Sequence, residues 1–179
     1  MPAGLISDAR EEFVKGRTIE LPPASPAHAR LIERLNALLR SSLFDAADTW
    51  RILSSSYALG IEPGFRACRN PDLAVFRRED LQQARVESNN IFAVPRLVVE
   101  CLSPRDRKGP VPDLLEDYHR MRAVEVWIID PYERTVSRHL ATDQRAEQLT
   151  RIGDPLKAIE LPAVSVPIDD LWRAFDGEW

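Results

Sequence analysis

The sequence predicts an α/β (α+β) fold in which a mixed-sheet core is flanked by helices, with additional strands near both ends. Three observations predict it. Residues 96–130 read as strand, helix and strand, an order typical of a crossover between parallel strands. The stretch 72–77 reads as a strand joined to 96–101 by a long loop, so we expect these two to be antiparallel neighbours. Further short strands are predicted outside this region.

Length and composition predict one domain over residues 1–179, with enough chain to bury a real core. The apolar share of 44% and the charged share of 29% are ordinary for a soluble globular protein. The net charge of -4 provides no overall attraction to DNA, so any nucleic-acid contact requires a local basic patch.

Cysteine content and hydropathy predict a cytoplasmic protein without a membrane segment. Cys68 and Cys101 fit a reducing compartment, and their spacing matches no zinc site. The N-terminus has no basic region followed by an apolar one, as a signal peptide would. No apolar run approaches the roughly 18 to 20 residues that a membrane-spanning helix needs.

The N-terminal half is predicted to contain one long helix between strands. After a short helical opening, residues 16–23 read as a brief strand ended by two prolines. Ser25 is a good N-cap for a helix over 25–44, and Pro26 suits its first position. Its apolar stripe consists of Leu31, Ile32, Leu35, Leu38 and Leu39.

Residues 50–65 look strand-like, with turn signals at Gly60 and at Pro63–Gly64. The strand 72–77 is then followed by a polar loop through 87–90.

The C-terminal half is predicted to supply the centre of the sheet. Strand 96–101 is apolar on both faces, which is typical of a central strand. A helix over 110–123 follows, with Leu114, Leu115, Tyr118 and Met121 as its inward stripe, and strand 124–130 runs parallel to 96–101. Short strands near 134–141, 147–152 and 157–161 and a closing helix over 166–175 complete the chain.

Glu100 is the unusual residue, because it interrupts the apolar run "LVVECL". A carboxylate buried among apolar side chains costs several kcal/mol unless it has a partner or takes up a proton. Asp72 opens one of the two antiparallel strands and Glu100 closes the other, so both acids are expected at one rim of the sheet. Paired carboxylates repel each other unless a proton or cation lies between them. Hard oxygen ligands of this kind suit Mg²⁺ or Mn²⁺.

Each acid also has an ordinary interpretation. Asp72 follows a proline, and a turn aspartate commonly bonds its own backbone. Glu100 would then be a strand-end residue that faces solvent or pairs with Arg66 or Arg69.

Several spaced motifs resemble the bacterial putative restriction endonuclease family of the PD-(D/E)XK nuclease fold. They are "PDLAVF", "LVVECLSP", a tyrosine-bearing helix and "VEVWIIDP". The stretch "GRTIELPPASPAHARLIERL", with His28 near the helix start, and the tail "AIELPAVSVPIDDLW" extend the resemblance over about residues 12–176. The resemblance implies a restriction-endonuclease-like core, Asp72 and Glu100 as catalytic metal ligands for Mg²⁺ or Mn²⁺, and DNA as the partner.

The chain departs from the family pattern at the catalytic lysine. The resemblance places this lysine at Leu102, or on the following helix at Leu114, and neither position carries a cation. Lys108, in the loop after Glu100, is the candidate replacement, although a lysine on a flexible loop is poorly preorganised. Losing such a group typically costs roughly 10² to 10⁴ in rate.

Three further residues are candidates for binding substrate phosphates. Arg105 and Arg107 lie beside Lys108, although a charged loop is more often merely solvated, and His28 is alternatively a capping or surface residue.

Three functions therefore remain open. The first is a metal-dependent endonuclease that hydrolyses DNA phosphodiesters, with catalysis impaired by the missing lysine. The second is a catalytically degenerate nuclease fold that serves as a DNA-binding or protein-interaction module. The third is an unrelated small α/β protein. A homodimer would suit a nuclease that addresses two strands, but no sequence feature demonstrates one.

Overall fold

The computed structural model of the protein describes residues 11–21, 23–54, 57–63, 67–87, 90–104, 111–141, 143–148 and 154–178, with only the backbone considered for 143–148. The helices are α1 (Pro26–Ser42), the short 3₁₀ helix η1 (Phe44–Ala46), α2 (Arg78–Gln82), α3 (Val111–Arg120) and α4 (Ile168–Asp176). The strands are β1 (Glu11–Val14), β2 (Arg17–Glu20), β3 (Trp50–Ser54), β4 (Ala58–Gly60), β5 (Cys68–Arg69), β6 (Leu73–Arg77), β7 (Arg85–Glu87), β8 (Asn90–Phe92), β9 (Leu97–Cys101), β10 (Glu125–Asp130), β11 (Thr135–Leu140), β12 (Asp143–Gln148), β13 (Leu156–Lys157) and β14 (Ser165–Val166).

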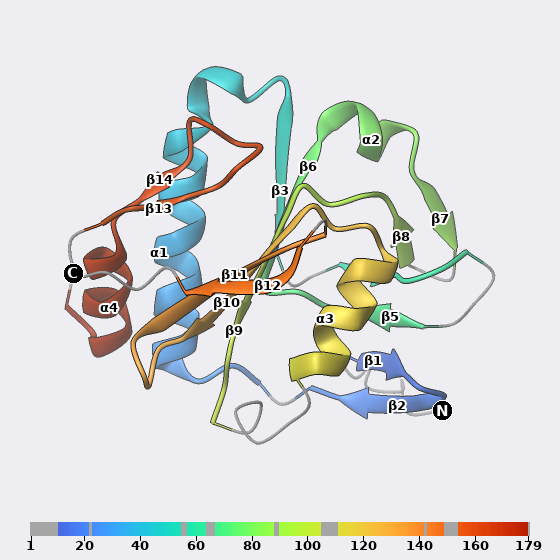
Figure 1. The fold of residues 1–179 in the computed structure, drawn as a ribbon, viewed down its shortest axis with the longest axis horizontal. Coiled ribbons are helices and arrows are strands. Elements are labelled where there is room, and N and C mark those ends of the chain that lie inside the picture. The colour runs from blue at the N-terminus through green and yellow to red at the C-terminus, as the bar shows by residue number, and fades with distance from the viewer. Residues whose placement is uncertain are drawn as a thin grey trace, which may run out of the picture.

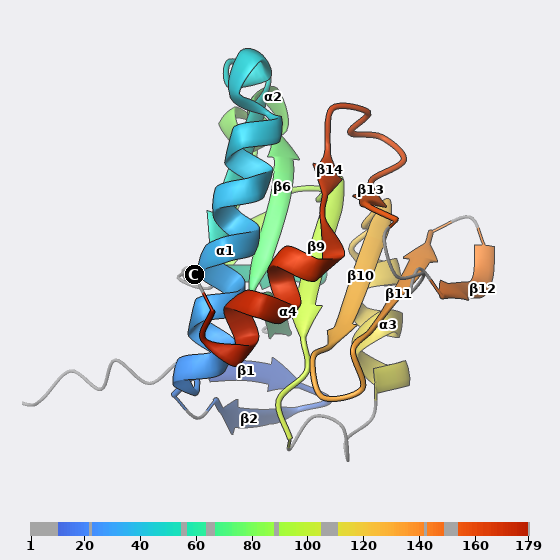
Figure 2. The ribbon, with the colours of Figure 1, turned by 90° about the vertical axis from the view of Figure 1, so that its left-hand side faces the viewer.

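Within these residues the strands form two larger sheets and one small hairpin. The main sheet has the order β12-β11-β10-β9-β6-β3, and the side sheet has the order β2-β1-β5-β4-β8-β7. Helices α1 and α4 and the β13–β14 hairpin cover one face of the main sheet, whereas α3 and the side sheet lie on the other side (Figure 1). Turned by 90°, the molecule shows α1 and α4 packed together in front of the main sheet (Figure 2).

The main sheet is buried on both faces because apolar side chains alternate along its central strands. Leu73, Val99 and Trp127 pack into the cluster under α1 and α4. Their neighbours Ala74 and Val98 pack into a second cluster under α3. A strand that is apolar on both faces is therefore central, as the sequence of β9 predicts.

The predicted pairing of the core strands is confirmed. β9 runs parallel to β10, with Val98 beside Val126. β6 runs antiparallel to β9, with Leu73 opposite Val99. The mixed sheet flanked by helices confirms the predicted α+β class.

Several local predictions are wrong. Glu11–Val14 is a strand where we expect a helical opening, and the supposed polar loop after β6 contains α2, β7 and β8. Gly60 ends β4 and does not form a turn. An added Cβ there would lie 2.2 Å from Cε1 of Phe92, so the glycine permits close packing of the side sheet.

The start of α1 follows the prediction. The side chain of Ser25 accepts a hydrogen bond from the main-chain N–H of His28 (3.2 Å), and Pro26 is the first helical residue. This cap places His28 in the first turn of α1, beside the end of the main sheet where β6 begins. Among the described residues, no helix is long and apolar enough to cross a membrane.

Candidate active site

Asp72 and Glu100 lie at the same end of the main sheet. Leu73 pairs with Val99 in the antiparallel register of β6 and β9, so one step further Asp72 stands opposite Glu100. Directly opposed residues in antiparallel strands project to the same face. The alternation of buried residues makes this the face that α3 covers. The sequence prediction that strand pairing brings the two acids to one rim agrees with this register.

Asp72 is held by two donors from different elements. The main-chain N–H of Cys101 donates to Asp72 Oδ2 (2.9 Å), and Nε2 of His28 lies 3.1 Å from Asp72 Oδ1. The side chains of Asp72 and His28 are 10% and 15% exposed. Within the described ranges, the carboxylate of Asp72 bonds partners from α1 and β9 and not its own turn, and His28 faces Asp72.

Glu100 is partly buried and has a side-chain partner. The hydroxyl of Tyr118, which is fully buried on α3, donates a hydrogen bond to Glu100 Oε1. The ordinary alternative of an ion pair with Arg69 is not observed, and Arg66 lies outside the described residues.

Burial and the nearby charge of Asp72 raise the pKa of Glu100 well above its usual range. The hydrogen bond from Tyr118 and the charge of Arg69 oppose this rise, whereas Glu12 adds to it. Burial and the charge of Glu100 likewise raise the pKa of Tyr118, so its hydroxyl remains a donor. Two acids that disfavour each other's charge attract a proton or a cation.

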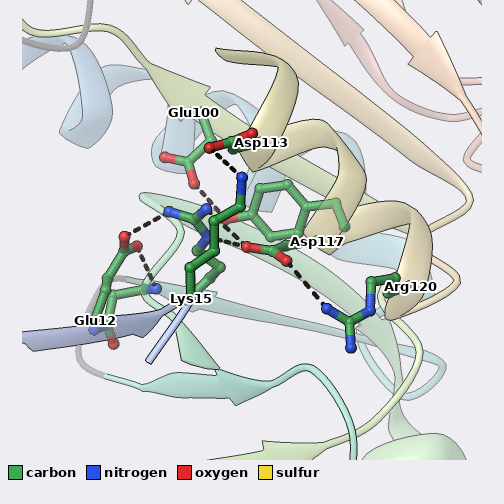
Figure 3. A network of polar contacts seen from close by, with 9 residues as sticks. Glu12, Lys15, Glu100, Asp113, Asp117 and Arg120 are labelled. Atoms are coloured by element: carbon green, nitrogen blue, oxygen red, sulfur yellow. Dashed lines mark hydrogen bonds and ion pairs between the residues drawn. The ribbon is translucent and has the colours of Figure 1, made fainter. Parts of the chain in front are cut away.

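A buried ion network lies beside Glu100 (Figure 3). Arg69 donates through its NH1 group to Glu12 Oε2 (2.9 Å) and through its Nε to Asp117 Oδ2 (2.9 Å). The main-chain N–H of Asn70 donates to the other oxygen of Glu12 (3.0 Å). Burial acts to lower the pKa of Arg69, but the interactions with Glu12 and Asp117 outweigh burial, so the pKa is raised above its usual value.

This network is not apparent in the sequence because its members come from three distant segments. Arg69 is 57 positions from Glu12 and 48 from Asp117, and local periodicity carries no information about such pairs. The available signal is weak: Glu12 and Asp117 are acids on otherwise apolar stripes.

Most of the cations predicted to contact the substrate cannot be located relative to the acid pair. Arg105, Arg107 and Lys108 lie outside the described residues, so their roles stay predictions. Leu114 is partly buried and packs against the cluster under α3, so this position carries an apolar side chain and no charge. Nearer the side sheet, Lys15 forms an ion pair with Asp113 on α3 (2.8 Å).

The donor set at this rim suits a hard divalent cation. Asp72 and Glu100 supply carboxylate oxygens, the ligands that Mg²⁺ and Mn²⁺ prefer. Among the described residues, no three His, Cys, Asp or Glu side chains are grouped so as to hold a metal ion. The protein would thus contribute two acids, and Mg²⁺ commonly binds through one or two carboxylates and completes its shell with water and phosphate oxygens.

A mixed sheet flanked by helices, with paired acids where two of its strands meet, defines a nuclease-like α+β protein. The model of the Uma2 family, described as "Putative restriction endonuclease", matches residues 5–168, and the chain belongs to this family. The chain is also similar to a solved structure from Anabaena variabilis, described as a "putative nuclease belonging to DUF820". The two share 18% identity and a TM-score of 0.73, with 92% of this chain and 90% of that chain covered. No curated protein matches the sequence.

Proposed function

We propose that the protein is a metal-dependent endonuclease that hydrolyses phosphodiester bonds in DNA. The observation that supports this function is the position of Asp72 opposite Glu100 at one end of the main sheet. Burial and the charge of Asp72 raise the pKa of Glu100 there. Membership of a family of putative restriction endonucleases supports the same reaction class.

Asp72 and Glu100 would hold Mg²⁺ or Mn²⁺ at this rim. Such a cation polarises a phosphodiester and lowers the pKa of a bound water. The residues around the pair would keep the ligands oriented: the main-chain N–H of Cys101 fixes one oxygen of Asp72, and Tyr118 fixes one oxygen of Glu100. A carboxylate side chain that is already held in place loses less conformational entropy when it binds a metal ion.

We propose that cations from outside this pair bind the substrate. His28 already faces Asp72 and would contact a phosphate at the rim. Arg105 and Arg107 would contact the DNA backbone, and Lys108 would assist proton transfer or stabilise developing charge. Because Leu114 replaces the cation expected on α3, catalysis by this chain would be slow.

Calorimetric titration with Mn²⁺ tests the metal site. Wild-type protein is expected to release or absorb metal-linked heat that Asp72→Asn abolishes. Asp48→Asn is the matched control, because Asp48 is a fully exposed acid whose described ion pair is with Arg78 of α2. Absence of metal-linked heat in the wild type would contradict the proposal and leave an α+β domain without this site.

A cleavage assay separates the endonuclease from the second candidate, a degenerate DNA-binding or protein-interaction module. Plasmid and single-stranded DNA are incubated with Mn²⁺ and either wild-type protein or Glu100→Gln. Cleavage that Glu100→Gln abolishes supports the endonuclease. Metal and DNA binding without cleavage would support the module.

A further inference from the structure

Arg69 is a buried cation between two buried acids. Its side chain is 8% exposed, and those of Glu12 and Asp117 are 9% and 11% exposed. NH1 faces Glu12 Oε2 at 2.9 Å, while NH2 and Nε face Asp117 Oδ2 at 2.7 and 2.9 Å. Each polar end of the guanidinium is therefore engaged, and each end holds a different element.

The network ties α3 to the side sheet. Glu12 belongs to β1 and Arg69 to β5, both strands of the side sheet, whereas Asp117 belongs to α3. Figure 3 shows Glu12 on β1 and Asp117 on α3, and the ion pairs of Arg69 with both acids connect the two elements. The planar fork of arginine fixes the direction of its hydrogen bonds, which a lysine ammonium does not. Arg69 thus contributes, with the ion pair of Lys15 and Asp113, to where this part of α3 lies.

The next residue of α3 is Tyr118, whose hydroxyl donates to Glu100 Oε1. The side chains of Asp117 and Tyr118 leave adjacent positions of one helical turn, so a shift at one moves the other. Within the part of the chain that the structure describes, Arg69 forms no hydrogen bond with Glu100 itself. Two hydrogen bonds connect them instead, from Arg69 to Asp117 and from the adjacent Tyr118 to Glu100.

We propose that Arg69 is a positioning residue for Glu100, acting through Asp117 and Tyr118 of helix α3. The metal affinity of the acid pair then depends on a guanidinium that binds neither metal nor substrate. This inference rests on the proposed function for its metal readout, and a second readout tests it without metal.

A double-mutant cycle tests whether Arg69 affects metal affinity through Tyr118. Mn²⁺ affinity is determined by calorimetry for wild type, Arg69→Lys, Tyr118→Phe and the double variant, all well below their melting temperatures. Because partners that orient metal ligands typically contribute about 10- to 100-fold in affinity, each single variant is expected to bind at least about 10-fold more weakly. If Arg69 acts through Tyr118, the double variant binds no more weakly than Tyr118→Phe alone.

Independent losses that multiply in the double variant would overturn the inference, as would an unchanged affinity in Arg69→Lys. A merely structural role for Arg69 would lower the melting temperature and leave the Mn²⁺ affinity of the folded protein intact. Asp117→Asn, which keeps the shape of the side chain, takes the place of Arg69→Lys in the cycle if the latter does not fold.

The second readout follows Tyr118 directly. The chain has three tyrosines, and in the structure Tyr118 is fully buried whereas Tyr57 and Tyr132 are 47% and 41% exposed. Labelling with 3-fluorotyrosine therefore gives a ¹⁹F signal for Tyr118 that Tyr118→Phe identifies. We expect this signal to shift in Arg69→Lys.

Arg120→Lys is the matched control, since Arg120 lies on the same helix and its short ion pair is with the half-exposed Glu62 (2.7 Å). Its ion pair with Asp117 is longer (3.8 Å), and lysine keeps the charge at this position. The control should leave the Tyr118 signal in place. An unmoved Tyr118 signal in Arg69→Lys overturns the inference whether or not the wild type binds Mn²⁺. A shifted signal without any Mn²⁺ heat in the wild type would contradict the proposed function and support the positioning.

Discussion

Leu114 is an apolar residue at the position of α3 where the family resemblance implies a cation. It packs into the cluster under α3, four positions before Tyr118, whose hydroxyl reaches Glu100. A lysine at this position would lie on α3, the helix whose Tyr118 donates a hydrogen bond to Glu100. The residue present contributes packing free energy and no charge.

Leu114→Lys is expected to create or raise DNA cleavage, by roughly 10²- to 10⁴-fold if the ammonium reaches the acid pair. It should also lower the melting temperature, because a partly buried ammonium is poorly solvated. Cleavage rates and thermal unfolding are measured together. Glu116→Lys is the control, since it adds a lysine to an exposed position of α3. A loss of stability with no gain in cleavage would count against the assignment of position 114.

At the scale of elements, the long helices and the core strands are predictable from the sequence because their signals are local. The apolar stripe of α1 and its Ser25 cap lie within one segment of the sequence. The apolar residues on both faces of β9 likewise indicate a central strand. The side sheet is largely missed, because β5 has two residues and β4 has three. Strands this short carry no periodicity, and long-range pairing defines them.

Gly60→Ala tests the side sheet. The added Cβ would lie 2.2 Å from Cε1 of Phe92, and overpacking of this kind typically costs about 1–3 kcal/mol. Urea unfolding should show this loss of stability, and Phe92→Leu should restore part of it in the double variant.

Gly16→Ala is the contrasting control. Its Cβ would meet nothing within 4 Å, so its effect comes from the positive φ of +78° alone. If Phe92→Leu rescues both alanine variants equally, steric contact at Gly60 is not the cause.

At the scale of the whole molecule, we expect residues 1–179 to unfold as one domain. Urea unfolding followed by far-ultraviolet circular dichroism and by tryptophan fluorescence should then give coincident single transitions. Two separated transitions would show that the side sheet and the main sheet unfold independently.

The pH dependence of stability includes a contribution from His139. Burial, followed by the charge of His119, lowers the pKa of His139. Its Nε2 lies 3.0 Å from the hydroxyl oxygen of Ser137. The unfolded chain takes up a proton near the ordinary pKa of about 6.5, where the folded protein does not. This contribution to stability is therefore complete above that pH and is lost as the pH falls toward the lower folded pKa.

His139→Gln is expected to lose less stability than wild type when the pH is lowered from 7.5 to 5.5. The difference between the two proteins isolates His139, because the raised pKa of Glu100 acts in the opposite direction in both. The measurement is the free energy of unfolding in urea at each pH. Equal losses in the two proteins would show that His139 titrates alike in the folded and unfolded chains.

The two acids of the candidate site are predictable from the sequence, whereas the residues that contact them are not. Asp72 and Glu100 are visible in the sequence because each breaks the pattern of a core strand, and the register of those strands then brings them together. The partners that hold them are not visible in the same way. His28 reaches Asp72 from α1, and Tyr118 reaches Glu100 from α3. Only the packing of these helices on the sheet decides which side chain contacts which acid.

The anchor on Asp72 is a peptide group, and this affects how the protein can change over generations. Every residue except proline carries the N–H that holds Asp72 Oδ2, so small apolar residues that fit the buried site of Cys101 preserve this hydrogen bond. Descendants of this chain can therefore exchange the thiol, or gain and lose charged neighbours, while the sheet keeps one acid in place. The position of this carboxylate oxygen then depends on the pairing of β6 with β9 and not on the identity of the neighbouring side chain.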